Sequence, residues 1–198
     1  MKKIISLFII IFFSKNLAIA AETYFDLSEN EIQIETDFTG KEVIIFGIFE
    51  KGEDTLVAIE GPKKDTKVMK KEKILAFWFN TKKVIYKDLP TLFFLASSSP
   101  IKDILNKNTI IKEKLYFDEL LVNAITQRNF IDQKNLDQWN SNLITIKKNE
   151  NLFKEYKFNN IDNKLFQTRV FFPSNSIPGE YTVNIFQIKD KIIVNKKN

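Results

Sequence analysis

The chain has 198 residues, 44% hydrophobic and 28% charged, which is enough for one domain with a sizeable core. It contains neither histidine nor cysteine, which excludes disulfides, thiolate nucleophiles, His-based triads and zinc sites of the usual Cys/His kind. Its formal net charge is +5, and five glycines leave little room for a glycine-rich phosphate loop. Composition therefore removes several enzyme classes without assigning a function.

The N-terminus has the organisation of a secretory signal peptide. Two lysines are followed by the apolar run Ile4–Phe13 and then by the small residues Ala18 and Ala20. An uncleaved anchor is the alternative, but a helix of about ten residues spans only about 15 Å of the roughly 30 Å hydrocarbon core. We therefore predict cleavage after Ala20 and export of residues 21–198 to the periplasm.

Removal of the signal peptide also changes the charge. Lys2, Lys3 and Lys15 leave with it, so the 30 basic and 25 acidic residues become 27 and 25, a net charge of +2. Only Arg128 and Arg169 are arginines, and arginine is the side chain best suited to hold phosphate through two hydrogen bonds. Nucleic-acid binding is therefore not expected. Without cysteine, apolar burial must stabilise the exported fold.

Residues 22–98 contain short apolar segments separated by turn signals, which predicts closely spaced strands. The strict alternation of Glu31–Glu35 is typical of a half-buried strand, whereas Ile74–Phe79, apolar on both faces, is typical of a buried central one. Asn80–Lys82 is expected to separate that strand from the next. The predicted strands are Glu31–Glu35, Glu42–Phe49, Thr55–Glu60, Lys67–Met69, Ile74–Phe79, Val84–Tyr86 and Leu92–Ala96.

Residues 100–156 change to helical patterns. Pro100 suits the first turn of a short helix over Ile101–Leu105, and a second short helix is expected over Phe117–Ile125. A longer helix begins at Leu136, and we interpret its apolar stripe as docking it on the sheet. That stripe consists of Leu136, Trp139, Leu143, Ile146 and Phe153. Both tryptophans, Trp78 and Trp139, are therefore predicted to be core residues.

Strands are predicted again over Lys164–Phe172, Tyr181–Ile188 and Ile192–Val194. The segment Gly179–Val183 resembles the corner of immunoglobulin-like sandwiches, in which a tyrosine near a strand start donates a hydrogen bond to upstream backbone. We therefore predict a mainly β fold. The specific expectation is an immunoglobulin-like β-sandwich over residues 21–198, with a helical insertion at about 100–156 between the early and late strands.

Candidates for catalysis are few. Ser99 and Lys102 match S-x-x-K, in which a lysine activates a serine, but the Lys-Thr-Gly element that accompanies this motif is absent. Two pairs of carboxylates lack any sequence feature that would raise the pKa of one member for acid–base catalysis: Glu29 with Glu31, and Asp54 with Glu60. We predict no catalytic, cofactor-binding or metal-binding residues, and we expect that the protein is not an enzyme.

A basic stretch covers residues 63–87, with nine lysines against Asp65 and Glu72, a local net charge of +7. It includes the apolar run Ile74–Phe79. Anionic lipid attracts such clusters, so one interpretation is a surface that contacts a membrane or an acidic partner, at low salt only. The other, which we favour, is a buried strand flanked by solvated lysines. The candidate interaction surface consists of Lys70, Lys71, Lys73, Trp78, Asn80, Ser97 and Ser98.

A series of short motifs spans the chain from Asp26 to Val194. The motifs are Asp26-Leu27-Ser28, Phe38-Thr39-Gly40, Phe46-Gly47, Gly61-Pro62, Lys71-Glu72, Trp78 with Asn80, Ala96-Ser97-Ser98 with Pro100, and Pro178-Gly179 with Tyr181-Thr182. In order and spacing they resemble an uncharacterised family of alphaproteobacterial putative transmembrane proteins. The resemblance implies a signal peptide, an extracytoplasmic β-rich domain and usually one C-terminal transmembrane helix.

This sequence departs from that family plan at its end. It finishes at Asn195–Asn198, and no segment after the signal peptide approaches the 18 apolar residues of a membrane span. The chain is therefore either a soluble member of the family or a truncated form. By association alone, the resemblance also implies a transporter-type protein of the inner membrane as a partner.

Three functions are compatible with these observations. The first is a non-catalytic periplasmic binding or accessory module for a membrane protein. The second is a hydrolase of cell-envelope material that uses serine and lysine or carboxylates. The third is a structural envelope protein. We expect the first, with location in the periplasm and association with the inner membrane, because the chain carries an export signal and lacks histidine and cysteine.

Overall fold

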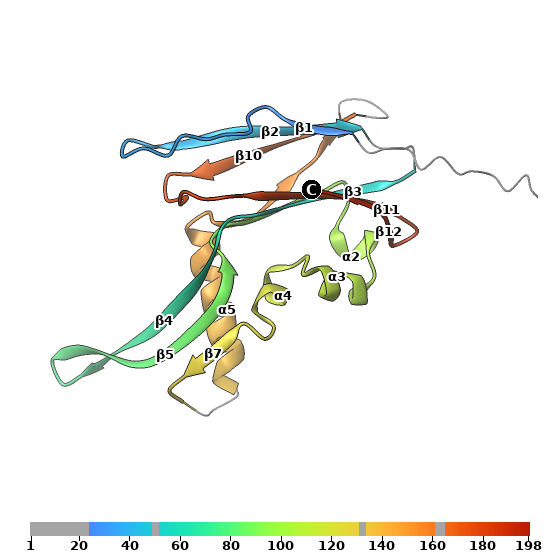
Figure 1. The fold of residues 1–198 in the computed structure, drawn as a ribbon. Helices are drawn as coiled ribbons and strands as arrows, with labels where there is room; N and C mark the ends of the chain where they lie inside the picture. The colour runs from blue at the N-terminus through green and yellow to red at the C-terminus, as the bar shows by residue number, and fades with distance from the viewer. Residues whose placement is uncertain (1–23, 49–51, 131–133, 161–164) are drawn as a thin grey trace, which may run out of the picture.

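The computed structural model describes residues 24–48, 52–130, 134–160 and 165–198. The fold is mainly β, as the sequence predicts, and its strands form three sheets (Figure 1). The signal peptide that we predict for residues 1–20 lies outside the described residues.

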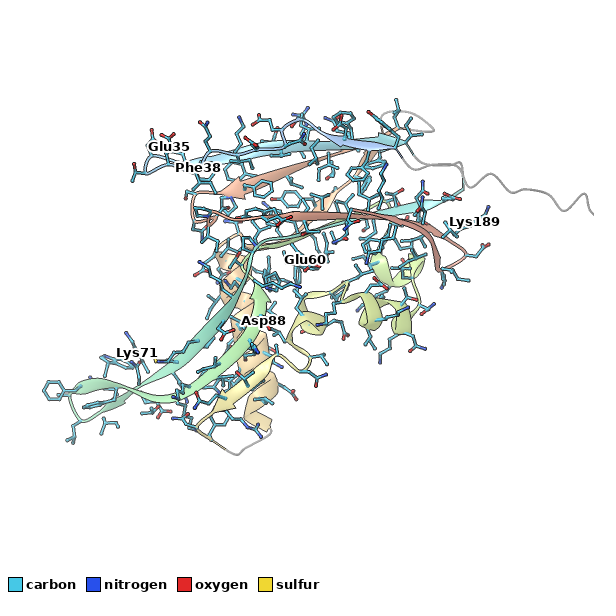
Figure 2. All side chains as sticks on the ribbon, viewed as in Figure 1. Glu35, Phe38, Glu60, Lys71, Asp88 and Lys189 are labelled. Carbon is cyan, nitrogen blue, oxygen red and sulfur yellow. The ribbon has the colours of Figure 1, made fainter. Side chains whose placement is uncertain are left out.

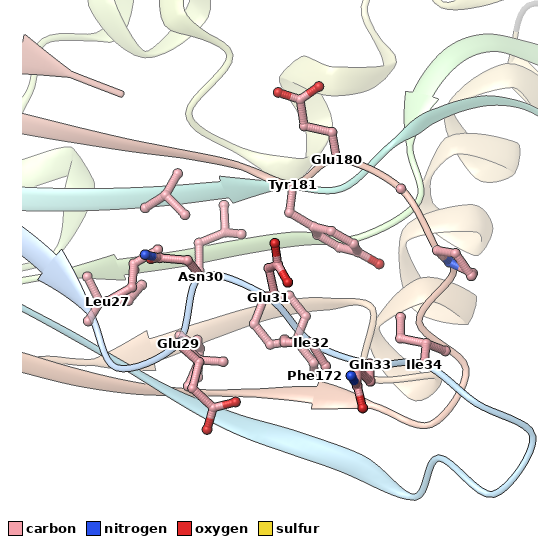
Figure 3. Close-up of a pocket in the computed structure, with 17 residues that line it drawn as sticks. Leu27, Glu29, Asn30, Glu31, Ile32, Gln33, Ile34, Phe172, Glu180 and Tyr181 are labelled. Atoms are coloured by element: carbon pink, nitrogen blue, oxygen red, sulfur yellow. The ribbon is translucent and has the colours of Figure 1, made fainter.

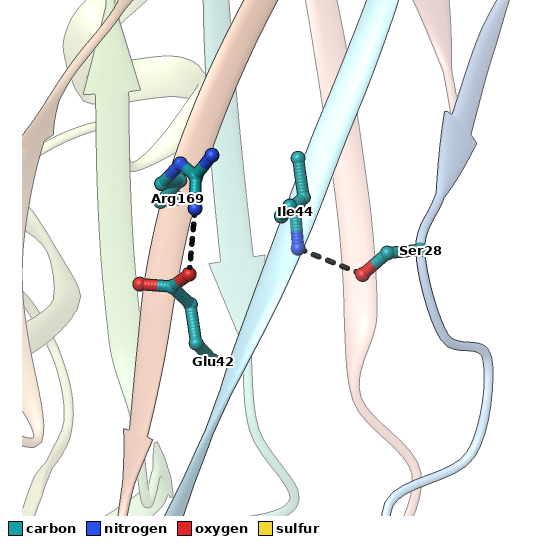
Figure 4. A network of polar contacts seen from close by, with 4 residues as sticks. All are labelled: Ser28, Glu42, Ile44 and Arg169. Atoms are coloured by element: carbon teal, nitrogen blue, oxygen red, sulfur yellow. Dashed lines mark hydrogen bonds and ion pairs between the residues drawn. The ribbon is translucent and has the colours of Figure 1, made fainter.

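The first sheet contains the N-terminal strands. Its order is β1-β2-β10-β9, and the strands are β1 (Phe25–Leu27), β2 (Gly40–Ile48), β9 (Asn159–Asn160) and β10 (Leu165–Pro173). All the pairs are antiparallel, and alternate residues of β2 and β10 are buried. Two polar contacts of β2 support this sheet (Figure 4): the Ile44 N–H donates to Ser28 Oγ at 2.9 Å, and Glu42 pairs with Arg169 of β10 at 3.0 Å.

The second sheet lies beneath the first in Figure 1 and is more deeply buried. Its order is β12-β11-β3-β6-β8, and the strands are β3 (Asp54–Glu60), β6 (Phe93–Ser97), β8 (Phe153–Lys157), β11 (Thr182–Lys189) and β12 (Ile192–Lys197). β3 and β6 are central strands with residues buried on both faces. β8 runs parallel to β6, so the chain between them must cross over, and it does so through helices.

The two sheets share an apolar core. The ring of Phe172 in β10 contacts Phe94 in β6 at 5.7 Å and Tyr181 at 5.4 Å between centroids. Tyr156 of β8 joins the sheets a second time, because its hydroxyl accepts from the N–H of Phe171 and donates to the carbonyl of the same residue, both at 3.1 Å. These contacts fix the sheets face to face.

The corner at Tyr181 has the hydrogen bond that the sequence predicts. Its hydroxyl donates to the carbonyl of Ile177, four residues upstream, at 2.7 Å. Gly179 adopts φ of 151°, and a Cβ there would come within 2.4 Å of Pro62. Glycine is therefore required for the chain to pass this close before β11 begins.

Helices cover the far face of the second sheet (Figure 1). They are α2 (Ile101–Ile104), α3 (Lys107–Glu113), α4 (Phe117–Leu121) and α5 (Lys134–Asn149). Phe117 of α4 stacks on Phe153 at 5.4 Å and meets Phe93 edge-on at 5.9 Å, which attaches this layer to β6 and β8. Trp139 of α5 is buried and stacks on Phe130, so its prediction as a core residue is confirmed.

The longest predicted helix is correct in position but ends earlier than its apolar stripe suggests. Asn151, at φ of 57°, terminates α5, and the Leu152 N–H donates to the carbonyl of Lys147 at 2.9 Å. Phe153 therefore belongs to β8, and Ile146 is exposed on the helix surface. The preceding helix also ends early, at Leu121, and Ile125 begins the strand β7 (Ile125–Arg128).

The third sheet, β4-β5-β7, corrects two predictions. β4 (Lys63–Ile74) and β5 (Phe77–Pro90) form one long hairpin, so the predicted central strand Ile74–Phe79 is wrong: it spans the hairpin turn. Asn80–Lys82, predicted as a separator, lies within β5, where the register shifts by one residue. The predicted strand Glu31–Glu35 is wrong as well. Ile32 packs on the core and its neighbours alternate in burial, but the segment pairs with no strand of the described sheets.

Candidate functional site

The feature of the fold that stands apart from the core is the β4–β5 hairpin, Lys63–Pro90, here called the arm. It leaves the second sheet between β3 and β6 and projects away from both packed sheets (Figure 1). Two backbone hydrogen bonds close its root, from Gly61 N–H to the Leu92 carbonyl at 2.8 Å and from Thr91 N–H to the Pro62 carbonyl at 3.0 Å. The arm is therefore a continuation of the central strands.

The inner half of the arm is anchored to the domain. Val84 and Tyr86 are buried, and the Tyr86 hydroxyl donates to Asn140 Oδ1 of α5 at 3.0 Å. Burial raises the pKa of Tyr86 to about 12. β7 pairs with β5 along the same stretch, Val84–Tyr86, and gives this half a third strand.

The anchoring ends at Thr81. The Asn129 side chain, just after β7, accepts from the Lys83 N–H at 2.7 Å and donates to the Thr81 carbonyl at 3.1 Å. Beyond that point the described sheet consists of β4 and β5 alone. A two-stranded ribbon has marginal stability of its own in water, so the outer half depends on the rigidity of its base.

The outermost residues, Ile74–Phe79, are here called the tip. They are all exposed, including Leu75 at 94%, Phe77 at 69% and Trp78 at 67%. The prediction that Trp78 is a core residue is therefore wrong. Leu75 also has φ of 57°, a left-handed conformation that a branched apolar side chain adopts at a cost. Solvent exposure of such a sequence is unfavourable unless something covers it.

Lysines surround the ribbon behind the tip. Residues 70–83 hold five lysines and one glutamate, a net charge of +4. Lys70 Nζ forms an ion pair with Glu72 Oε1 at 2.8 Å. Hydrogen bonds from Lys70 and, to a smaller extent, from Thr81 lower the pKa of the Glu72 carboxyl. Lys73 is paired directly with Trp78, which places both side chains on one face of the ribbon. Figure 2 shows the side chains that extend beyond Lys71 to the end of the arm.

Five of the seven residues predicted as an interaction surface lie on the arm: Lys70, Lys71, Lys73, Trp78 and Asn80. Ser97 and Ser98 do not, because β6 carries them to the opposite end of the second sheet. There the Ser98 hydroxyl donates to Asp54 at 2.7 Å and accepts from the Thr55 N–H at 3.1 Å. Ser98 therefore secures the end of the β3–β6 pair.

Sequence reasoning missed four apolar side chains of the tip as site residues: Ile74, Leu75, Phe77 and Phe79. The signal that could have found them is an apolar run with lysines on both sides in a chain whose core was already amply supplied with phenylalanine. Neither end of that run carries a Gly or Pro turn signal, so it reads as a single strand.

A cavity of about 450 Å³ lies between the first two sheets, at the side where residues 27–34 cross the opening (Figure 3). Its lining is mixed: it includes the apolar or aromatic residues Phe172 and Tyr181 together with Glu29, Glu31 and Glu180. Glu29 is already paired with Lys41 at 2.8 Å. The cavity has the volume of a small-ligand site, but its described lining includes neither serine nor lysine.

The remaining chemical candidates are engaged elsewhere in the fold. Lys102 Nζ lies over the ring of Tyr116, 5.5 Å from its centroid. Asp54 accepts from Ser98, and Glu60 pairs with Lys63 at 3.6 Å. Within the part of the chain that the structure describes, no three acidic side chains are grouped so that they could hold a metal ion.

The family model described as "Putative transmembrane protein (Alph_Pro_TM)" matches residues 22–198. The chain belongs to this family. No curated protein and no solved structure matches the chain. The family description fits association with a membrane, and among the described residues no helix has both the length and the apolar character to cross one.

Proposed function

We propose that this protein is an exported, non-catalytic module of the cell envelope that serves as an accessory to a membrane protein, and that the arm holds it at the membrane. The observation that carries the proposal is the exposed apolar tip at the end of a well-anchored hairpin. Membership of a family described as transmembrane supports the same location.

The tip is better explained by an interaction than by folding. Contiguous exposed apolar side chains mark contact sites with proteins or membranes, and here they lie at the point farthest from the core. Leu75 occupies a turn position at which Asn or Gly would be more stable in water. A sequence that keeps leucine there is better suited to contact with an apolar partner than to solvent.

We also infer that the two packed sheets form a sandwich of the immunoglobulin-like type. Lettered along the chain, β1-β2-β10-β9 corresponds to A-B-E-D and β12-β11-β3-β6 to G-F-C-C′, and Tyr181 precedes the strand lettered F. In this lettering the arm is an insertion between C and C′. Nuclear Overhauser contacts of Phe186 with both Leu56 and Lys196 are expected, and their absence would contradict this strand order.

Export is part of the proposal and has its own measurement. The exported protein is expected to begin at Ala21, since the apolar run and the small residues that precede this position match a cleaved signal. Intact mass of protein from the envelope of a producing bacterium measures the cleavage site. Protein that still begins at Met1 would contradict it.

Fractionation of such cells tests the role of the arm. The exported wild-type protein is expected in the membrane fraction, and the double variant Leu75→Ser/Phe77→Ser in the soluble fraction. The matched control is Ile192→Ser/Val194→Ser, which removes two exposed apolar side chains from β12 and should stay with the membrane. Equal amounts of wild type and tip variant in the membrane fraction would overturn the proposed function.

A further inference from the structure

We propose that the tip inserts directly into the headgroup region of an anionic lipid bilayer, with the lysines behind it in contact with lipid phosphates. This inference rests on the proposed function and specifies its partner: the arm contacts lipid itself.

Apolar side chains lie on both faces of the ribbon at the tip. Ile74 is paired with Phe77, and Lys73 with Trp78, and successive pairs point to opposite faces. The adjacent Glu72–Phe79 pair lies on the same face as Ile74 and Phe77. Two phenylalanines therefore lie on one face of the ribbon, and Trp78 lies on the other. A groove or a flat protein surface covers one face of a ribbon, whereas a fluid bilayer surrounds both. The arrangement therefore favours lipid.

The length of the tip limits how deeply it can enter. Three consecutive apolar residues of β5, Phe77–Phe79, set this length, which at about 3.3 Å per residue is roughly 10 Å. That matches the depth of about 5–10 Å at which amphipathic elements lie in the interface. The outer halves of β4 and β5 each have one edge without a neighbouring strand in the described structure, and unpaired backbone groups are not tolerated in hydrocarbon. The tip is therefore suited to the interface and not to the hydrocarbon core.

The charge behind the tip matches a phosphate-rich surface. Lys73 and Lys71 lie one and three residues before the tip begins at Ile74, so their ammonium groups reach headgroup level when the tip is inserted. Lysine stems can lie along apolar surface while the charge remains in water, and tryptophan is favoured at the same level. Glu72 does not oppose this attraction strongly because it is paired with Lys70.

Exposure of the tip changes the expected response to salt. A basic patch alone would release from lipid as salt is raised, because the Debye length falls from about 10 Å at 0.1 M to about 3 Å at 1 M. Burial of apolar side chains is not screened in this way. Binding is therefore expected to weaken with salt but to persist, in contrast to the release that a buried Trp78 would imply.

The test is binding of the exported protein, purified from the envelope, to vesicles of pure lipid. Co-sedimentation with vesicles of phosphatidylglycerol and phosphatidylethanolamine is compared at about 0.05 M and about 0.5 M salt. We expect binding at both, at least about tenfold weaker at the higher salt. Leu75→Ser/Phe77→Ser should lower the affinity at least about tenfold at both. Lys71→Glu/Lys73→Glu should lower it mainly at low salt.

Fluorescence reports the position of Trp78. With lipid brominated at the headgroup end of the acyl chains, tryptophan emission of the wild type should be quenched and shifted to shorter wavelength. Trp78→Phe should still bind, within about threefold, but lose the quenching, because Trp139 is buried in the domain. The control Ile192→Ser/Val194→Ser should behave as the wild type, and circular dichroism should show that every variant is folded.

The outcomes separate this inference from the proposed function. Absence of vesicle binding, together with fractionation that still depends on the tip, would overturn lipid insertion and identify a membrane protein as the partner. Binding that high salt abolishes, or that persists without quenching of Trp78, would assign the contact to lysines alone and overturn insertion. Vesicle binding unaffected by the tip substitutions would overturn both the inserted tip and the role of the arm.

Discussion

Tyr86 is the residue that attaches the arm most directly to the domain. Its side chain is 0% exposed although it lies in a hairpin that is mostly solvated, and its hydroxyl donates to Asn140 of α5. Burial disfavours the charged phenolate, which is why the pKa rises from 10.0 to about 12. The same residue therefore fixes the base of the arm and couples it to pH.

The pKa of Tyr86 predicts a loss of stability in alkali. Between pH 10 and about 12 the unfolded chain releases the tyrosine proton while the folded chain retains it, so the free energy of unfolding falls as pH rises. From pH 9 to 11 the contribution of this one group is about 1.3 kcal/mol. Urea unfolding of the wild type and of Tyr86→Phe at the two pH values should show that much less loss in the variant. An equal loss would mean that water reaches the hydroxyl in the folded protein.

At the scale of elements, the strands whose side-chain pattern reflects burial could be predicted from sequence. β2, β3, β6, β10 and β11 are near their expected places because each alternates or is apolar throughout in agreement with its place in the sheets. The bond of Tyr181 to Ile177 was also predictable, because both groups lie within four residues along the chain. Features whose evidence lies within a short stretch of the chain can therefore be predicted from sequence.

The arm could not be predicted, because its exposure is set by a turn that carries no sequence signal. Ile74–Phe79 has the composition of a core strand, and Leu75 takes the left-handed position without Gly or Asn. The lysines, Trp78 and Asn80 were identified as surface candidates, but their common element became visible only once β4 and β5 were paired. β7 and β8 were missed because their alternation is short and mostly exposed.

Substitution of the two tryptophans measures how far the arm is independent of the core. Trp139→Ala should lower the free energy of unfolding by about 3–5 kcal/mol, through lost burial and the cavity left beside Phe130. Trp78→Ala should change it by less than about 0.5 kcal/mol, since the side chain is mostly solvated in both states. Urea melts give both values, and the two variants serve as controls for each other. A large loss in Trp78→Ala would mean that the tip folds back on the domain.

At the scale of the whole molecule, two sheets and a helical layer make one continuous core, and the tip contributes no residue to it. The inner half of the arm belongs to that core through Val84 and Tyr86, whereas the outer half is joined to it only through the ribbon. Stability and the proposed membrane contact therefore belong to separate parts of the chain. A domain arranged in this way can change its tip without changing its fold.

Removal of the tip should consequently leave the domain intact. Replacing Glu72–Phe79 by Asn-Gly joins Lys71 to Asn80, which are paired across the hairpin, through a two-residue turn of the kind that such strands favour. The removed apolar side chains are exposed in the folded state as well as the unfolded one, so their loss subtracts little burial. The free energy of unfolding in urea should stay within about 0.5 kcal/mol of the wild type, with the same far-UV circular dichroism. A variant that loses more than about 1 kcal/mol would show that the tip stabilises the folded domain in solution, and the division between core and contact surface would then be wrong.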